Sequence, residues 1–455
     1  MGMGRKKNRE KQQGLWVPAS EIVTTPGHIY YERLNTVLAA EKFDQRVEAM
    51  CRKYYKSSAG RPSLTPGTYF RMLLLGYFEG LDSERGIAWR AADSLSIRKF
   101  LGYDLSEPTP DHSTVSRTRR LYSVETHRAV MRWVLKILRK HGLAQGQSVC
   151  IDATTLAANA AMKSLVRRDT GIGYDEYLKQ LAQAEGIENP TKEQAARLDR
   201  KRKKKGSNDD WTNPNDPSAR ITKMKDGRTK LAHKAEHAVD LADGAVLAVT
   251  VQPADRGDTS SYIETLEAAQ VESRKAHPAG IEEVVMDKGY HSSAVMIDLA
   301  KRNLRSYVPE PERGRRKWAG KPHEQRCVYE NRRRVRGARS KRLQKLRGEL
   351  CERSFAHCYE TGAMRRVHLR GSRNVLKRVL VHAAAFNIGL LLRKLSGWGK
   401  PRQAQGRFHV FSICLDVTTT LMVWVRSFQA SLAVKLVIFS DWQAVFKLRG
   451  SATGC

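Results

Sequence analysis

Apolar residues in the first third of the chain recur at the spacing of helices. The segment 64–83, LTPGTYFRMLLLGYFEGLDS, opens with Thr65 as a candidate N-cap and Pro66 at the first helical position. Further helical patterns cover residues 82–92, 94–101, 112–122 and 124–141. Polar residues or prolines separate these patterns. We therefore predict an all-α, helix-turn-helix-like domain over residues 31–142, preceded by a basic extended arm at residues 1–30.

The pattern changes from helical to mixed after Gly142. Residues 147–156, QSVCIDATTL, have the composition of a buried strand, and residues 229–241 and 244–253 have that of an antiparallel hairpin. Helices and short strands then alternate: a helix at 258–275, a strand at 282–287, a helix near 292–303, a strand at 305–309, a helix containing 348–357 and a long helix at 374–395. This alternation predicts an α/β domain over residues 143–395, with a mixed sheet flanked by helices.

Three segments depart from this alternation. Residues 163–225 lose apolar periodicity and contain DRKRKKKGSNDDWTNPNDPS, so we expect a charged insertion that is either a loop ordering on DNA or plain disorder. Residues 313–347 are strongly basic. The tail at 396–455 includes an apolar run at 408–425, but Asp416 within that run opposes membrane insertion. Paired strands or a packed tail are the better interpretation of that run.

The net charge of the chain indicates the kind of partner that it binds. Lysine and arginine outnumber aspartate and glutamate by 81 to 47, a net charge of +34, and such an excess is typical of proteins that bind nucleic acid. A membrane surface is the alternative, but the basic residues are spread along the whole chain and not gathered on one amphipathic helix. Seven widely spaced cysteines and the lack of an apolar run after the basic N-terminus predict a cytoplasmic location.

Three carboxylates have the placement of a metal site. Asp152 and Asp287 each end or nearly end a predicted strand, and Glu352 lies on a late helix. Neighbouring strands lie about 4.8 Å apart, so aspartates at one level of two adjacent strands can share divalent cations. Oxygen-only ligands favour Mg²⁺ or Mn²⁺. Glu349 lies three residues from Glu352, near the same helix face, and is the alternative third ligand.

Seven motifs, in order, resemble those of DDE-type transposases of bacterial insertion sequences. They are TTPGHIYYERLN, RPSLTPGTYFRMLLLGYFEG, PTPDHSTVSR, IDATTLAANA, KAEHAVDLADGAV, VVMDKGYHS and a C-terminal group comprising ERSFAH, MRRVHLRG and HAAAFNIG. The resemblance covers residues 15–395 and implies a ribonuclease-H-like core. It also implies that Asp152, Asp287 and Glu352 form the triad that holds two Mg²⁺ or Mn²⁺ ions.

The resemblance further implies a function on double-stranded DNA. A protein of this family binds the terminal inverted repeats of its element, pairs them as a homodimer without a membrane partner, and cleaves and transfers strands. A catalytically inactive repressor and a structure-directed nuclease on the same core are the alternatives. Candidate DNA contacts are Arg117, Arg119, Arg120, Arg365, Arg366 and Arg370. Asp111 is a candidate cap for the helix that carries the first three arginines. Tyr290 and His291 are candidates for supporting the site or for packing.

Overall fold

The computed structural model describes residues 28–55, 63–201, 207–224, 226–312, 314 and 316–404. Residues 31–399 of this set form one structural unit, and residues 28–30 and 400–404 belong to a second. The apolar run at 408–425 and nearly all of the expected basic arm lie outside the described residues.

The helical half begins and ends its helices with ordinary capping chemistry. Its helices are α1 (Ile29–Ala40), α2 (Phe43–Cys51), α3 (Pro66–Phe78), α4 (Glu84–Asp93), α5 (Leu95–Leu101), α6 (His112–Leu121) and α7 (Val124–Lys140). The Thr65 hydroxyl accepts the Thr68 N–H at 3.3 Å, and the Asp111 carboxylate accepts the Ser113 N–H at 2.8 Å. Both predicted caps are confirmed, because each satisfies an N–H that has no partner within the helix.

The other half is built on a mixed sheet. Its strands are β1 (Ser148–Ala157), β4 (Arg220–Lys223), β5 (Thr229–Asp240), β6 (Val246–Pro253), β7 (Glu283–Val285) and β8 (Arg305–Tyr307). Their order is β4-β5-β1-β7-β8, with β6 also paired to β5. Strand β1 runs antiparallel to β5 and parallel to β7, which runs parallel to β8. The path β6-β5-β1-β7-β8, three antiparallel strands followed by two parallel ones, is a ribonuclease-H-like core, as predicted.

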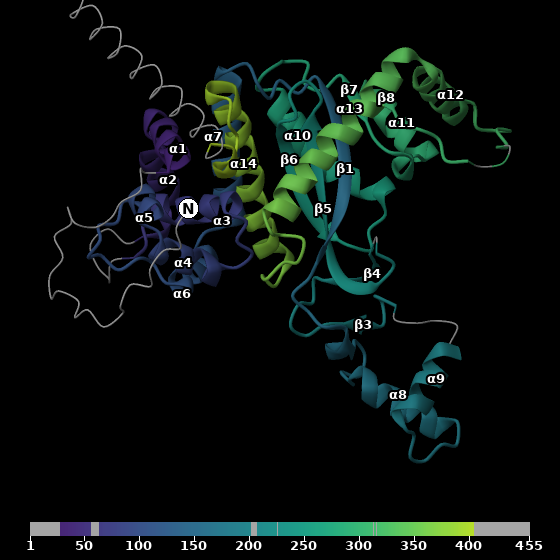
Figure 1. Ribbon diagram of the computed structural model, residues 1–455. Coiled ribbons are helices and arrows are strands. Elements are labelled where there is room, and N and C mark those ends of the chain that lie inside the picture. Colours follow the sequence, from purple (N-terminus) through teal and green to yellow (C-terminus); the bar gives the residue numbers. More distant parts are fainter. Residues whose placement is uncertain are drawn as a thin grey trace, which may run out of the picture. The chain divides into compact units, whose positions relative to one another are not determined.

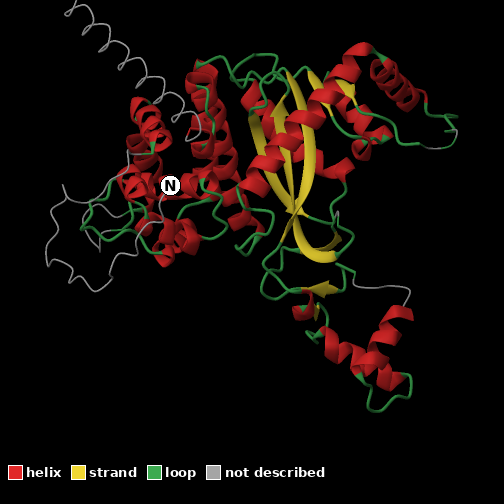
Figure 2. Ribbon diagram, in the orientation of Figure 1, coloured by secondary structure: helices red, strands yellow, loops and turns green. Residues whose placement is uncertain are grey.

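Helices cover both faces of this sheet. Adjacent residues of β5 point to opposite faces. Glu236 accepts a hydrogen bond from Ser261 of α10 (Asp258–Ser273), whereas His237 bonds Ser354 of α13 (Ala338–Phe355). Helices α10 and α13 therefore lie on opposite faces, and α13 crosses the strands obliquely (Figures 1 and 2). Helices α11 (Ser293–Lys301) and α12 (Pro322–Arg336) pack beside β8.

The long helix α14 (Ser372–Ser396) joins the two halves. Asn387 bonds both backbone groups of Val246 at the edge of the sheet, at 2.9 and 2.8 Å. Lys377, in the first turns of α14, donates to the Arg119 carbonyl of α6 at 2.9 Å. Within the described residues, one helical stretch, Ser372–Ala404, is long and apolar enough to cross a membrane, but 89% of its most apolar window is buried inside the protein.

The expectation that residues 163–225 form a loop is wrong. This segment contains β2 (Val166–Arg167), α8 (Tyr174–Ala184), α9 (Lys192–Lys201), β3 (Trp211–Thr212) and β4. Its side chains pack into a small core of Ala158, Leu165, Trp211, Ala219 and Leu231. Two of these residues, Ala158 and Leu231, lie outside the segment, so its apolar content alone underestimates the surface it buries.

His127 makes the stability of the helical half depend on pH. Its ring lies 2.8 Å from the Ser123 carbonyl and 3.0 Å from the Tyr69 hydroxyl, and burial lowers its pKa from 6.5 to about 4. Below pH 6.5 the unfolded chain thus binds a proton that the folded chain does not. The stabilisation is complete above pH 6.5 and is lost as the pH falls toward 4. When the pH falls from 7 to 5, we expect the buried His127 to lower the free energy of unfolding by about 2 kcal/mol.

Urea unfolding at pH 7 and pH 5 measures this contribution. In His127→Gln, which cannot titrate in this range, the loss of unfolding free energy between the two pH values should be smaller by about 2 kcal/mol. The matched control is His141→Gln at the end of the same helix α7, which should keep the wild-type difference. Equal pH dependence in wild type and His127→Gln would contradict this assignment.

Candidate active site

Asp152 lies in the middle of β1 and points toward α13. One carboxylate oxygen accepts the Ala153 N–H at 2.8 Å, and the other receives the Arg347 guanidinium of α13 at 2.8 Å. Both side chains are 21% exposed. The Arg347 guanidinium thus lies beside this carboxylate, in a position that a metal ion would also need.

Asp287 lies just beyond the end of β7. The backbone still follows the sheet at Met286, whose N–H donates to the Tyr307 carbonyl of β8 at 3.3 Å. Asp287 then caps a 3₁₀ turn, Lys288–Tyr290, by accepting the Gly289 N–H. The capping bond holds the carboxylate at the sheet's edge, where the chain leaves the strand.

The register of β1 and β7 sets the relation between the two aspartates. The paired residues are Ser148 with Glu283, Val149 with Val284, and Cys150 with Val285. Two further residues along each parallel strand lead to Asp152 and Asp287. Adjacent strands lie about 4.8 Å apart, so the register brings the two aspartates to one level of the sheet.

Helix α13 presents one face to these strands. Gln344 donates to the Met286 and Tyr307 carbonyls at 3.3 and 2.8 Å, Arg347 bonds Asp152, and Ser354 lies 3.0 Å from His237. Burial and a hydrogen bond with Cys150 raise the pKa of Cys351 on this face, so its thiol stays protonated. These residues repeat at intervals of three or four, the spacing of a single helix face.

The two candidate glutamates differ in their distance from that face. Successive residues of an α-helix are rotated by about 100°, so Glu352 lies about 100° from Cys351 and flanks its face, whereas Glu349 lies about 160° from it. Glu349 forms an ion pair with Arg353 on the same helix. Among the described residues, no three His, Cys, Asp or Glu side chains are close enough together to hold a metal ion. The three carboxylates are therefore not gathered into one cluster: Asp152 and Asp287 lie two residues past the last β1–β7 pair, and Glu352 lies beside the face of α13 that meets the sheet.

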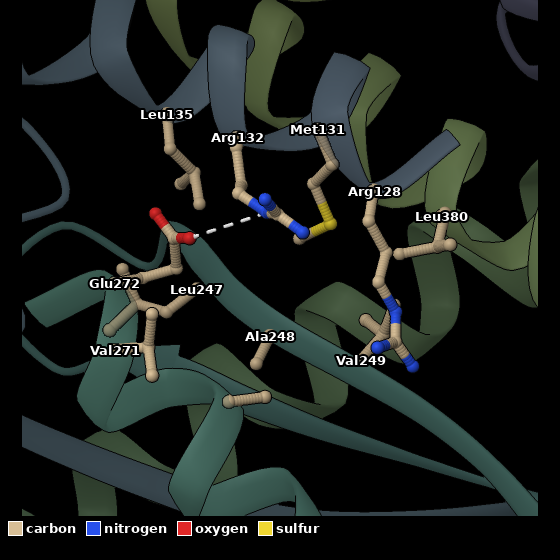
Figure 3. Close-up of a pocket in the computed structure, with 11 residues that line it drawn as sticks. Arg128, Met131, Arg132, Leu135, Leu247, Ala248, Val249, Val271, Glu272 and Leu380 are labelled. Carbon is tan, nitrogen blue, oxygen red and sulfur yellow. Dashed lines mark ion pairs between the residues drawn. The ribbon is translucent and has the colours of Figure 1, made fainter. Parts of the chain in front are cut away.

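A separate cavity of about 290 Å³ lies between α7, β6 and α10 (Figure 3). Its walls are mostly apolar, and Arg132 of α7 reaches toward Glu272 of α10 across it. Strand β5 separates β6 from β1, so this cavity is not the place where the aspartates meet. The aspartates instead follow the last β1–β7 pair, Cys150 with Val285, on interior strands of the sheet.

Comparison with known families agrees with this geometry. Residues 146–388 match the family described as transposase DDE domain, over just more than half of the chain. The chain belongs to the DDE transposase family. Residues 18–121 match a second family, described as a transposase domain (DUF772), which includes helices α1 to α6. No curated protein and no solved structure gives a significant match.

The DDE match spans both aspartates and both candidate glutamates of the transposase. It begins just before β1 and ends within α14, so it includes the whole sheet. DDE transposases generally use divalent metal ions, and the chemistry of the three carboxylates fits such ions. The resemblance seen in the sequence is therefore confirmed at the level of the family.

The predicted DNA-contact arginines of α6 do not share one environment. Arg117 and Arg120 are exposed on α6. Arg119 is only 7% exposed, and its guanidinium pairs with Glu84 of α4 at 2.6 Å. The expectation that Arg119 contacts DNA is therefore corrected, because its charge is already used to join two helices.

The arginines that follow the π-helical segment Ala356–Thr361 lie next to β1. Arg365 donates to the Thr154 hydroxyl at 2.8 Å and to the Thr155 carbonyl at 3.0 Å, and it also pairs with Glu360. Arg366 and Arg370 are exposed. This loop brings positive charge to the strand that carries Asp152.

Arg347 was not singled out from the sequence. It lies at the end of the basic stretch 313–347, where many arginines are alike in sequence. The spacing of Gln344, Arg347, Cys351 and Ser354 is the signal that could have distinguished it, since it places Arg347 on the face toward the sheet.

The ion pair between Arg347 and Asp152 should compete with metal binding. In Arg347→Ala, Mn²⁺ no longer has to displace a guanidinium, and a partly exposed pair of this kind is worth about 1 kcal/mol. We expect the Mn²⁺ affinity measured by calorimetry without DNA to rise about fivefold. Arg353→Ala removes an arginine from the same helix and should leave the affinity unchanged. An Arg347→Ala affinity equal to wild type would contradict this competition.

Proposed function

We propose that the chain is an insertion-sequence transposase that binds the terminal inverted repeats of its element and catalyses metal-dependent DNA strand cleavage and transfer. The observation that carries the proposal is the parallel register of β1 and β7, whose last pair, Cys150 with Val285, lies two residues before each aspartate. Two carboxylates at one level of adjacent strands can share a divalent cation. Asp287 lies beyond the end of β7 and Asp152 is partly exposed, which leaves room for a DNA strand.

Glu352 is the proposed third ligand. It flanks the face of α13 that meets the sheet, whereas Glu349 lies on the far side of the helix and pairs with Arg353. Glu352 lies nearer that face than Glu349 does, so it needs the smaller rotation of α13 to reach Asp152. Glu349 would have to break its ion pair and pass around the helix.

Asp152, Asp287 and Glu352 would together hold two Mg²⁺ or Mn²⁺ ions. Bound there, the two ions supply activation of an attacking water or 3′-hydroxyl and stabilisation of the leaving oxygen. The protein's own contribution is to hold three carboxylates, whose oxygen atoms are the hard donors that these ions prefer. Cys351 keeps its proton, so little thiolate competes for the ions.

Arg347 links DNA binding to the state of the site. Its guanidinium is held by Asp152 and by the Gln344 side chain, whose oxygen accepts its Nε–H at 3.1 Å. A DNA phosphate is a strong bidentate partner for a guanidinium. A phosphate near α13 therefore draws Arg347 away from Asp152 and leaves that carboxylate available to a cation.

The DNA path is proposed from exposed positive charge. Arg117 and Arg120 on α6 would contact the element's ends, and Arg366 and Arg370 would hold backbone phosphates near β1. Arg365 would act mainly by fixing its loop to Thr154. Two copies of the chain, one for each end, would form the synaptic dimer in the cytoplasm.

Cleavage of DNA that carries both ends of the encoding element tests the proposal. In Mg²⁺, Asp152→Asn, Asp287→Asn and Glu352→Gln should each lower the cleavage rate by at least about 100-fold, because each removes a metal ligand. Glu349→Gln should cleave like wild type and is the matched control. Removal of metal with a chelator should abolish cleavage in all proteins.

Other outcomes separate the alternatives. End-specific binding by wild type without any cleavage would support a repressor, and cleavage of branched DNA without end preference or strand joining would support a nuclease. Loss of activity in Glu349→Gln with normal activity in Glu352→Gln would overturn the choice of the third ligand. Thermal melting of each variant excludes a loss of fold as the cause.

A further inference from the structure

A buried carboxylate lies on the sheet face opposite α13. Glu236 of β5 is fully buried, with an exposed fraction of 0%. One oxygen accepts the hydroxyls of Ser261 at 2.8 Å and Tyr290 at 2.9 Å, and the other accepts the Thr265 hydroxyl at 2.6 Å. A carboxylate is costly to bury unless hydrogen bonds replace its water. All three described bonds come from neutral hydroxyls. Glu236 therefore acts as a hydrogen-bond acceptor that holds the side chains around it in place.

Tyr290 is the donor that reaches Glu236 from the aspartate turn. It ends the 3₁₀ turn that Asp287 caps and is 1% exposed. Burial raises the pKa of Tyr290 well above its usual range, so its hydroxyl keeps the proton that it donates. The turn is thereby fixed at Asp287 by the cap and at Tyr290 by a buried hydrogen bond.

This hydrogen bond spans a strand. Strand β1 lies between β7, which the turn follows, and β5, which carries Glu236. Glu236 is paired with Ala153, the residue next to Asp152. Paired residues on adjacent strands point to the same face, and the small Ala153 side chain leaves room for the tyrosine to pass. The bond thus ties the turn holding Asp287 to the strand position beside Asp152.

A second contact holds the same turn. Lys234 pairs with Asp258 and donates to the Ser261 hydroxyl at 2.8 Å, so Asp258 is linked to the group around Glu236. A side-chain carbon added at Gly289 would lie 2.9 Å from both the Asp258 and the Asp287 carboxylates. Asp258 therefore packs against the turn directly, and a larger side chain at residue 289 would have to displace the Asp258 and Asp287 carboxylates.

We propose that Tyr290 and Glu236 are positioning residues that fix Asp287 for metal binding. The proposal rests on the proposed function, because it takes Asp287 as a metal ligand. Neither residue touches the metal. Their hydrogen bond crosses β1 and keeps Asp287 level with Asp152. The two carboxylates are therefore already ordered before a cation binds. Groups that orient metal ligands typically change metal affinity by about 10- to 100-fold.

Binding of Mn²⁺ alone to the full chain, measured by calorimetry and by electron paramagnetic resonance, tests the proposal. Tyr290→Phe removes only the hydroxyl and should weaken Mn²⁺ binding about 10-fold or more. The matched control is Tyr262→Phe in α10, which loses a similar buried bond to Asp298, 2.6 Å long. This control should lower thermal stability without changing Mn²⁺ affinity.

A second pair of variants keeps the test valid if Tyr290→Phe does not fold. Glu236→Gln retains an oxygen for the tyrosine and removes the buried charge, so it should bind Mn²⁺ nearly as well as wild type. The double variant Glu236→Gln with Tyr290→Phe also loses the hydrogen bond between residues 236 and 290. Because residue 236 is then neutral, losing this donor leaves no buried charge uncompensated. The double variant should show the same loss of affinity and an altered resonance spectrum.

The outcomes separate this inference from the proposed function. Asp287→Ala is measured in the same assay. If Asp287→Ala loses Mn²⁺ binding while Tyr290→Phe and the double variant both bind like wild type, the positioning role is wrong and the metal site stands. If Asp287→Ala binds Mn²⁺ like wild type, the metal site is wrong and the positioning role fails with it.

Discussion

The parallel pairing of β1 with β7 is the constraint on which the catalytic half depends. A parallel ladder fixes which residues share a level, and here three consecutive pairs lead directly to Asp152 and Asp287. Parallel strands require a long crossover connection, which the hairpin partner β6 and helix α10 supply. The two aspartates are therefore far apart along the chain and adjacent in the sheet. The turn, the helix α13 and the buried tyrosine all act on that one pairing.

Several carboxylates around the sheet are buried or half-buried, and each is compensated in a different way. Asp152 faces the Arg347 guanidinium, Glu283 forms a two-oxygen pair with Arg339, and Glu236 has only hydroxyl donors in its hydrogen bonds. Removing a partner from a buried charge is costly. Asp152 differs from the other two in its own exposure, since its side chain is 21% exposed. Glu283 and Glu236 are buried, although Arg339 itself is largely exposed, so Asp152 is the carboxylate of the three that an exchangeable cation can reach.

The sequence predicts more of the fold than of the site. Periodicity identified the strand that carries Asp152, the helices of the N-terminal half and the caps at Thr65 and Asp111, because these are properties of neighbouring residues. The burial of Arg119 was missed, since its partner Glu84 lies 35 positions away and its charge resembles that of Arg117 and Arg120.

The insertion was missed for a related reason, since its small core includes Ala158, which follows β1, and Leu231 of β5, both outside the segment. Glu236 gave no signal, because one acidic residue in a strand can face water as readily as a network of hydroxyls. Long-range partners of this kind are not visible in local patterns.

Helix α14 has a consequence for the order of folding during synthesis. Its residues Lys377 and Arg378 donate to the carbonyls of Arg119 and Leu81 in the helical half, and Asn387 completes the edge of β6. The ribosome releases this helix after every other long element of residues 31–399. These two carbonyls of the helical half therefore lack their α14 donors until nearly 400 residues have been translated. A nascent chain released early would lack the helix whose side chains bond to both halves, so neither half would have its α14 contacts.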